Sequence, residues 1–268
     1  MAERVGIFDS GVGGLSVWRE IVRRLSGVET LYIADQAHIP YGSRRHDEVL
    51  AFARGISRYL VAERCRTIVV ACNTASAAAL QTLRLEFPQQ TFVGMEPAVK
   101  PAALKSQRKI VAVLGTAATL AGELMRRTAA RHATGVEILR QPCPGLVERI
   151  EAGELQGEAL EATLQDFLLE PLAAGADVIV LACTHYPLVR DSIEKIVGPG
   201  VQVIDPAAAI AMQLSRTLGE LPAVASNALP HEFRTTGAVA AFERVASAIL
   251  GSRVHATALR WQDGELAG

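Results

Sequence analysis

The sequence lacks the features that mark membrane and secreted proteins. Its longest apolar runs, such as residues 110–122, are shorter than the roughly 20 residues that a membrane span requires. The first residues, MAERVGIFDSG, contain no basic stretch followed by an apolar segment, so they do not resemble a signal peptide. We therefore expect a cytoplasmic protein without a membrane partner.

The sequence also lacks the basic surface that nucleic-acid binding requires. The 27 Lys and Arg residues are balanced by 28 Asp and Glu residues, and the formal net charge is −1. No polybasic run occurs, and aromatic residues, which would stack on bases, make up only 5% of the chain. Because affinity for nucleic acid depends on positive charge, we expect no nucleic-acid partner.

Cysteine is rare, and its spacing argues against two common uses. The four cysteines are Cys65, Cys72, Cys143 and Cys183, and no two of them form a C-x-x-C pair. The spacing does not support a zinc site or thioredoxin-type redox chemistry, so we expect no metal ion. In the cytoplasm all four would be free thiols.

Short runs of Val and Ile alternate with longer segments rich in Ala, Leu and Arg. This alternation predicts βαβ units and a parallel sheet, which is an α/β fold. The starts of corresponding strands in the two halves are 105 to 110 residues apart, which indicates an internal duplication. Strands are expected at residues 5–8, 31–34, 68–71 and 91–94, and again at 110–114, 136–140, 178–182 and 201–204.

The fold class expected is therefore two similar α/β domains, each a mostly parallel sheet flanked by helices. The duplication predicts that a pseudo-twofold relates them, with the active site between them. Prolines near residues 96–101 and 205–206 mark the two crossings. The first domain is expected to comprise residues 1–97 plus 207–268, and the second residues 98–206.

The tail after residue 206 is expected to return to the first half of the chain. Its pattern predicts helices at 208–218 and 239–250 and strands at 231–235 and 254–258. The loop at 221–229 is expected to be mobile.

Polar residues follow the predicted strands in both halves. In open parallel sheets, ligands bind at the carboxyl ends of the strands, so these residues outline a candidate site. The mixture predicts a small ligand with both positive and negative groups. The residues are Asp9, Ser10, Asp35, Cys72, Asn73, Thr74 and Glu96, and then Gly115, Thr116, Cys143, Cys183, Thr184, His185 and Asp205.

Cys72 and Cys183 occupy matching places in the repeated segments IVVACNT and IVLACTH. Each follows a strand and precedes a helix, with Asn73 or Thr74 expected to cap the first helix and Pro187 expected in the first turn of the second. A helix N-terminus lowers the pKa of a thiol, so each cysteine could act as a base or as a nucleophile. The alternative is a pair of buried small side chains, but the repeated context favours function.

His185 and Asp9 are the candidate proton-handling partners of these thiols. His185 lies two residues after Cys183, and a histidine can hold or relay a proton near neutral pH. Asp9 ends the first predicted strand, where its alternative and compatible role is an Asx-turn before Gly11. Cys65 and Cys143 are expected to be structural.

The glycines at residues 11–14 resemble a phosphate-binding loop only in part. Ser16 replaces the last glycine of G-x-G-x-x-G, and Asp9 would repel a pyrophosphate. We expect instead that these glycines let the backbone approach the carboxylate of a small ligand closely. No cofactor is expected.

Five motifs follow one another along the chain. They are DSGVGG at 9–14, PYG at 40–42, ACNTAS at 71–76, LGT with a following AT at 114–119, and ACTHYP at 182–187. Together they resemble glutamate racemase, a family of the cofactor-independent aspartate/glutamate racemase superfamily. The resemblance extends to FRTTG at 233–237, which is nearly the whole chain.

The resemblance implies a two-base mechanism. One cysteine removes the Cα proton as a thiolate, and the other delivers a proton to the opposite face as a thiol. Cys72 and Cys183 match these two positions, and Asp9 and His185 match the residues that assist the first and second thiol. Glu151 matches an acidic position of the family. The positions that hold the substrate match Asp9, Ser10, Tyr41, Gly42, Asn73, Thr74, Thr116, Thr119, Thr184 and His185.

The resemblance further implies a substrate and a biological role. The substrate would be L- or D-glutamate, the product D-glutamate would serve peptidoglycan synthesis, and the protein would be a homodimer. Because the first motif begins almost at Met1, we expect no regulatory site of the kind that some relatives carry on an N-terminal extension.

Three alternatives remain open at this point. One is a racemase for aspartate or another amino acid, because sequence patterns do not set the length of the substrate side chain. The second is a hydrolase that uses Cys183 as nucleophile and His185 as base, which leaves Cys72 without a role. The third is a small-acid binding protein without activity.

Overall fold

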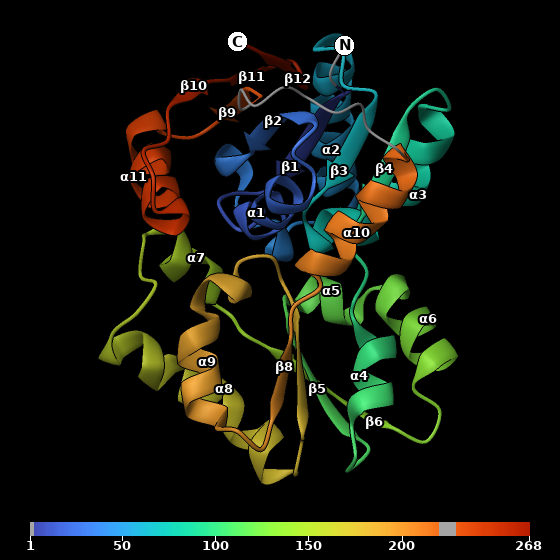
Figure 1. The fold of residues 1–268 in the computed structure, drawn as a ribbon, viewed down its shortest axis with the longest axis vertical. Helices are drawn as coiled ribbons and strands as arrows, with labels where there is room; N and C mark the ends of the chain where they lie inside the picture. The colour runs from blue at the N-terminus through green and yellow to red at the C-terminus, as the bar shows by residue number, and fades with distance from the viewer. Residues whose placement is uncertain (1–2, 220–228) are drawn as a thin grey trace. The chain divides into compact units, whose positions relative to one another are not determined.

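The structure, a computed structural model, describes residues 3–219 and 229–268. Strands and helices alternate along the chain, which confirms the α/β class (Figure 1). The chain divides into two compact units, of which unit 1 is Met1–Met95 with Ala207–Gly268 and unit 2 is Glu96–Pro206. Of the loop expected to be mobile, all but Leu229 lies outside the described residues.

Unit 1 contains a parallel sheet in the strand order β10-β9-β2-β1-β3-β4. The tail of the chain adds β9 beside β2 and β10 beside β9, so both strands belong to the sheet of the first half. The strands are β1 (Glu3–Asp9), β2 (Val28–Ala34), β3 (Thr67–Val70), β4 (Thr91–Gly94), β9 (His231–Thr235) and β10 (Ala256–Ala258).

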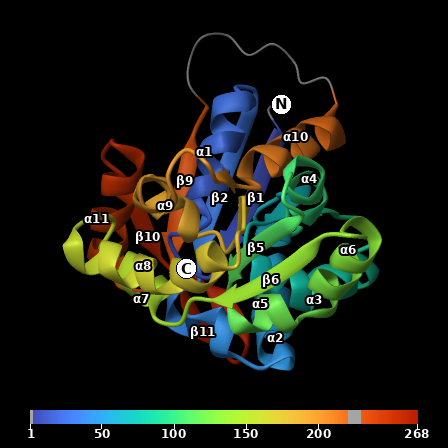
Figure 2. The same cartoon turned by 90° about the horizontal axis from the view of Figure 1, so that it is seen from below.

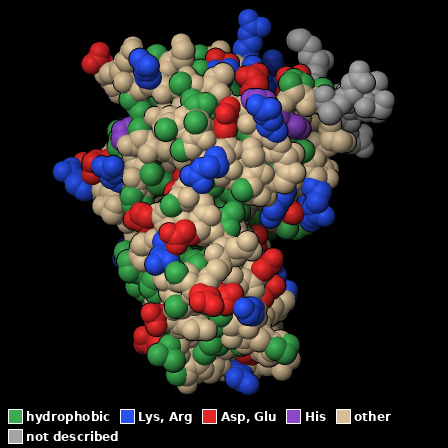
Figure 3. Space-filling view, turned by 90° about the vertical axis from the view of Figure 1, so that its left-hand side faces the viewer, with side chains coloured by type: hydrophobic (Ala, Val, Ile, Leu, Met, Phe, Trp, Pro, Cys, Tyr) green, Lys and Arg blue, Asp and Glu red, His purple; other side chains and the backbone are tan. Residues whose placement is uncertain are grey.

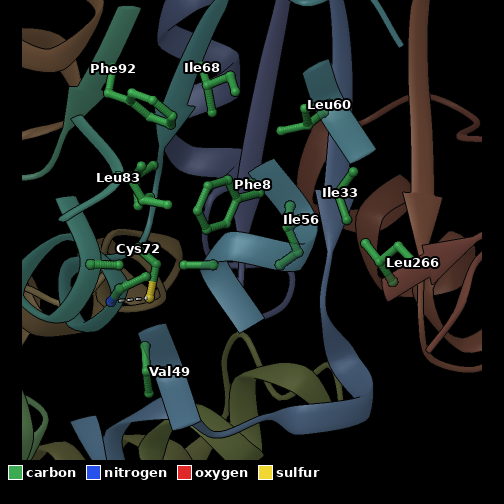
Figure 4. Packing of buried hydrophobic residues seen from close by; sticks show 14 of the residues in the cluster. Phe8, Ile33, Val49, Ile56, Leu60, Ile68, Cys72, Leu83, Phe92 and Leu266 are labelled. Atoms are coloured by element: carbon green, nitrogen blue, oxygen red, sulfur yellow. Dashed lines mark hydrogen bonds between the residues drawn. The ribbon is translucent and has the colours of Figure 1, made fainter. Parts of the chain in front are cut away.

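Helices cover both faces of this sheet, which explains why apolar residues on both faces of its central strands are buried. α2 (His46–Ala62) and α3 (Asn73–Glu86) bury Phe8 and Ile33 on one face, together with Cys72 (Figure 4). On the other face Tyr32 stacks on Phe242 of α11 (Val239–Leu250). α1 (Leu15–Arg24) packs there against α11 and against α10 (Ala207–Leu218). Two 3₁₀ turns, η1 (Gln36–His38) and η2 (Tyr41–Ser43), connect β2 to α2.

Unit 2 contains a second parallel sheet, in the order β6-β5-β7-β8. This is the order β2-β1-β3-β4 of unit 1 repeated with the corresponding strands, so the topology agrees with the duplication inferred from the sequence. The strands are β5 (Ile110–Gly115), β6 (Glu137–Pro142), β7 (Val178–Ala182) and β8 (Gln202–Ile204).

The sheet of unit 2 also has helices on both faces (Figure 2). α4 (Val99–Lys105) and α6 (Glu123–His132) pack together over Val111, Val113 and Val180. α8 (Glu158–Ala173) and α9 (Arg190–Val197) form a second pair on the opposite side. The connections contain α5 (Ala117–Ala121), α7 (Leu146–Glu151) and the 3₁₀ turn η3 (Tyr186–Val189).

All twelve predicted elements are present, and the strands at 91–94, 178–182 and 231–235 have the predicted bounds. The final hairpin, in which β11 (Arg260–Gln262) pairs with β12 (Glu265–Ala267), was not among the predicted elements. Its turn is Asp263-Gly264, with positive φ angles of 48° and 81°. An Asp-Gly pair between alternating apolar residues is a strong hairpin signal, so the sequence contained the evidence.

Candidate functional site

Asp9 ends β1 at the centre of the unit 1 sheet and is fully buried. Its Oδ2 accepts a hydrogen bond from the Gly11 amide at 3.0 Å, which confirms the Asx-turn. Gly14 follows at the N-terminus of α1, where an added Cβ would lie 2.6 Å from the Cβ of Asp9. The glycine at this position is therefore required by the close approach of Asp9.

Cys72 is buried two residues beyond the end of β3 and is itself the N-cap of α3. Its Sγ accepts the amide of Ala75 at 3.5 Å, the dashed contact in Figure 4. The prediction that Asn73 or Thr74 caps this helix is wrong, because the chain turns so soon after β3 that both already lie within α3. An N–H at a helix N-terminus stabilises negative charge on the sulfur.

Asn73, the residue after Cys72, is only 4% exposed. Neither its Oδ1 nor its Nδ2 has a hydrogen-bond partner among the described residues. Burying an amide without partners is costly, so this side chain is suited to a ligand that supplies them. Ser10, which follows β1, and Thr74 are also buried, and the amide of Ala71 donates to the carbonyl of Phe8 at 2.8 Å, which joins the ends of β1 and β3.

Tyr41 and Gly42 lie in η2, between β2 and α2. Tyr41 is buried in the same apolar cluster as Cys72, and its hydroxyl donates to Asp35 Oδ2 at 2.6 Å. Burial raises the pKa of Tyr41 well above its ordinary value of 10.0, and the negative charge of Asp35 raises it further. The phenol is therefore a neutral hydrogen-bond donor and not a base.

Cys183 follows β7 in unit 2 and is buried, but it does not cap a helix. Pro187 lies in the first turn of η3, and α9 begins only at Arg190. The prediction that both thiols lie at the start of an α-helix is therefore correct for Cys72 and wrong for Cys183. The sulfur of Cys183 instead lies 3.8 Å from Nδ1 of His185.

His185 connects Cys183 to a carboxylate. Its Nε2 lies 2.6 Å from Oε1 of Glu151, the last residue of α7, and its ring is almost fully buried. Burial lowers the pKa of His185, but the hydrogen bonds to Cys183 and Glu151 outweigh burial and raise the pKa well above 6.5. When it is protonated, the buried ring can stabilise negative charge on the sulfur of Cys183.

Thr116 and Thr119 lie after β5, the strand next to β7. Thr116 is the N-cap of α5, and its Oγ1 accepts the amide of Thr119 at 3.2 Å. The hydroxyl of Thr116 also donates to Oγ1 of Thr119 at 3.0 Å. Because Gly115 pairs with Ala182, these hydroxyls lie at the same edge of the sheet as the buried residues Cys183 and Thr184.

Cys65 and Cys143, the other two cysteines, differ in their position relative to the candidate catalytic thiols. Cys65 lies before β3, at the other end of that strand, and burial raises its pKa to about 12. Cys143 lies after β6, close enough to Cys183 for the two thiols to interact electrostatically. Burial and then the charge of Cys183 raise the pKa of Cys143 to about 12. Both are buried thiols, as expected, and Cys143 also forms part of the surroundings of Cys183.

Two residues of unit 1 contact Asp35 without any indication from the sequence. Trp261 Nε1 and the Thr236 hydroxyl both donate to Asp35 Oδ1. The sequence identifies Asp35 only as a polar residue at a strand end. Thr236 belongs to the FRTTG motif. Trp261 lies in the hairpin that was not predicted, and its contact with Asp35 spans 226 residues, which no local pattern indicates.

The described part of the chain contains no group of three His, Cys, Asp or Glu side chains that could hold a metal ion. No helix among residues 3–219 and 229–268 is long and apolar enough to cross a membrane. On the face shown in Figure 3, Lys and Arg side chains are interspersed with Asp and Glu, and no extended basic area is visible there.

Comparison with known proteins agrees with the resemblance inferred from the motifs. A glutamate racemase of Roseiflexus sp. (strain RS-1) is 48% identical over 219 residues, which is 82% of this chain and 80% of that relative. A glutamate racemase of Ectopseudomonas mendocina (strain ymp) is 42% identical over 250 residues, 93% of this chain and 95% of the relative.

Solved structures of glutamate racemases have the same fold. An isoform from Bacillus anthracis matches with a TM-score of 0.86 at 31% identity, covering 98% of both chains. The Escherichia coli enzyme in complex with L-glutamate and the activator UDP-MurNAc-ala matches with a TM-score of 0.85 at 28% identity, covering 100% of both. A family model described as Asp/Glu/Hydantoin racemase matches residues 5–214. The chain therefore belongs to the Asp/Glu/Hydantoin racemase family.

Proposed function

We propose that the protein is a cofactor-independent glutamate racemase that interconverts L- and D-glutamate with Cys72 and Cys183 as its two acid–base groups. The observation that carries the proposal is the pair of buried thiols at equivalent ends of β3 and β7, each next to a different group that stabilises a thiolate. For Cys72 that group is the amide of Ala75 at the start of α3. For Cys183 it is the imidazole of His185.

In the proposed reaction one cysteine acts as a thiolate and the other as a thiol. The thiolate takes the Cα proton, so an S–H bond forms while the electron pair of the C–H bond remains on Cα. The second thiol then gives its proton to the opposite face of Cα and becomes the thiolate. The reverse direction exchanges the two roles, which is why both sulfurs need a neighbour that tolerates either charge state.

The Cα proton of an amino acid is a very weak acid, so the carbanion-like state must be stabilised by preorganised groups. The Asn73 amide, which has no hydrogen-bond partner in the described part of the chain, can donate to the substrate carboxylate or accept from its ammonium group. We assign substrate contacts also to the residues at the two sheet edges. These are Asp9, Ser10, Tyr41, Gly42, Thr74, Thr116, Thr119, Thr184 and His185.

The test is to measure racemisation of Cys72→Ser and Cys183→Ser by circular dichroism, starting from each enantiomer. Each variant should lose about a thousandfold or more in kcat/KM, the range of general acid–base catalysis. Because the enantiomers have equal free energy in water, the loss must be the same in both directions. Cys65→Ala removes a buried thiol at the other end of β3 and should retain activity.

Isotope exchange in deuterated water then separates the two thiols. Each single variant keeps one working base, so Cys72→Ser and Cys183→Ser should exchange the Cα proton of opposite enantiomers. Racemisation that survives both substitutions would disprove the mechanism. A covalent acyl-enzyme would favour the hydrolase, and glutamate binding without exchange in the unmodified protein would favour the binding protein.

The finer assignments are part of the same proposal. Preference for glutamate over aspartate is tested by a panel of amino-acid substrates. A role in supplying D-glutamate for peptidoglycan is tested by depletion in cells with and without added D-glutamate. The homodimer is tested by light scattering, and the cytoplasmic location by cell fractionation.

A further inference from the structure

Asp35, the residue after β2, is the centre of a buried hydrogen-bond cluster in unit 1. Its Oδ2 accepts from the hydroxyl of Tyr41 at 2.6 Å and lies 2.9 Å from Nδ1 of His38. Its Oδ1 accepts from Trp261 Nε1 at 2.7 Å and from the hydroxyl of Thr236 at 2.8 Å. Four groups thus converge on one carboxylate that has no exposed surface.

The carboxylate is saturated by these neighbours. Two carboxylate oxygens offer about four acceptor sites, and four protein groups occupy them. Among the described residues no Lys or Arg forms an ion pair with Asp35. The hydrogen bonds from its neighbours therefore offset the unfavourable burial of the carboxylate. Asp35 is therefore not available to a ligand, and its role lies in what it holds.

The four partners come from three segments that are far apart in the sequence. His38 and Tyr41 belong to the loop between β2 and α2, Thr236 follows β9, and Trp261 lies in β11. Gln36 in the same loop accepts the Thr235 hydroxyl at 2.9 Å. Hydrogen bonds from Thr235, Thr236 and Trp261 thus connect the C-terminal part of the chain to Asp35 and to the loop formed by residues 36–43.

The loop of residues 36–43, together with Asp35, contacts the surroundings of Asp9 and Cys72, two of the residues proposed for catalysis. The amide of Asp35 donates to the carbonyl of Asp9 at 2.9 Å, and Tyr41 packs in the same cluster as Cys72. Aromatic contacts limit the movement of the loop, since the ring of His38 stacks on Phe52 at 3.8 Å and the ring of Tyr41 lies 5.7 Å from it. The orientation of Tyr41 is thereby determined by Asp35 on one side and by Phe52 on the other.

We propose that Asp35 is a positioning residue that holds the Tyr41–Gly42 segment in the conformation that receives the substrate, through its hydrogen bond from the Tyr41 hydroxyl. The inference rests on the proposed function and adds a residue that does not touch the substrate. The contacts through Oδ2 set substrate binding, whereas those through Oδ1 anchor the carboxylate to the tail of the chain.

Tyr41→Phe and Trp261→Phe form a matched pair for the test, because each deletes one donor to Asp35 and keeps an aromatic ring. Tyr41→Phe should raise KM for both enantiomers about tenfold, the equivalent of one charge-assisted hydrogen bond, with kcat changed less than about threefold. Trp261→Phe should lower the melting temperature and leave KM within about twofold. A purely structural cluster would give both variants the same kinetic effect.

Asp35→Asn and the double variant Asp35→Asn/Tyr41→Phe complete the cycle. Asp35→Asn should raise KM at least as much as Tyr41→Phe, and the double variant should be no worse than Asp35→Asn alone. If Asp35→Asn does not fold, the pair Tyr41→Phe and Trp261→Phe still decides the matter by its KM ratio.

The outcomes separate this inference from the proposed function. Failure of the unmodified protein to racemise glutamate would refute the proposed function. An active unmodified protein with unchanged KM in Tyr41→Phe, equal KM changes in Tyr41→Phe and Trp261→Phe, or additive effects in the double variant would refute the role of Asp35.

Discussion

Glu151→Gln should shift the alkaline limb of the pH profile of racemisation to lower pH. Glu151 Oε1 lies 2.6 Å from His185 Nε2, and the glutamine can keep this contact while removing the negative charge. In the proposed mechanism protonated His185 stabilises the Cys183 thiolate, so activity should fall as the pH rises through the pKa of His185. Without the charge of Glu151 that pKa decreases.

The size of the shift follows from the strength of the lost interaction. The pair is buried, with the side chains of His185 and Glu151 only 2% and 11% exposed, so water screens it little. A hydrogen bond to a charged group contributes about 1.5–3 kcal/mol and a neutral one about 0.5–1.5 kcal/mol, so removing the charge while keeping the contact loses about 1–1.5 kcal/mol. One pKa unit corresponds to about 1.4 kcal/mol, and the alkaline limb should therefore move down by about one pH unit.

The free energy of unfolding should also decrease as the pH rises. The pKa of His185 is raised in the folded protein above 6.5, so its stabilising contribution is complete below about pH 6.5 and is lost as the pH rises through the folded value. Glu151→Gln should reduce this pH dependence of the unfolding free energy. Urea denaturation at several pH values measures it.

The assay is kcat/KM against pH by circular dichroism, with the imidazole of His185 followed by NMR titration. Glu148→Gln is the matched control, because it removes the same charge from an exposed position on the same helix, α7. It should leave the profile within a few tenths of a pH unit. An unchanged or upward-shifted limb in folded Glu151→Gln would refute the reasoning.

Two further predictions concern the surroundings of the site. Gly14→Ala should destabilise the fold by about 2–3 kcal/mol, because the added Cβ would lie 2.6 Å from Asp9 Cβ and 2.7 Å from Tyr32 Oη. Gly200→Ala, whose Cβ would have no atom within 4 Å, should change the free energy of unfolding by less than about 0.5 kcal/mol. Chemical denaturation measures both changes, and equal effects would contradict the steric argument. Cys65 and Cys143 are buried, with pKa values raised to about 12, so they should react with iodoacetamide at pH 8 about a hundredfold more slowly in the folded protein than in urea. Mass spectrometry measures the labelling, and fast labelling of Cys65 in the folded protein would contradict its burial.

Much of the fold was predictable because its signals are local. Several strands contain a short apolar run bounded by polar or helical segments, and β4 and β7 could be placed to the residue from such runs. The repeated segments around Cys72 and Cys183 revealed the duplication in the same way. The signal of the final hairpin is equally local, since Asp263-Gly264 marks its turn between two strands of three residues each, although the hairpin was not predicted.

The helix caps were less predictable because they depend on where the backbone turns. The two repeats have similar sequences, yet Cys72 caps α3 directly, whereas an extra 3₁₀ turn delays α9 until Arg190. Pro187 favours that turn because its ring fixes φ and supplies no N–H. Equivalent cysteines thus receive different partners, a helix amide for one and His185 for the other.

The sequence by itself determined which residues are available for chemistry: two equivalent thiols, an aspartate at a strand end and a histidine beside the second thiol. Only the tertiary structure decided which groups set their charge and position. Glu151 meets His185 across 34 residues, and Trp261 meets Asp35 across 226 residues. Such contacts depend on which strands become neighbours and on which side chains are buried together, because hydrogen bonds in the interior form between groups adjacent in space, whatever their separation along the chain.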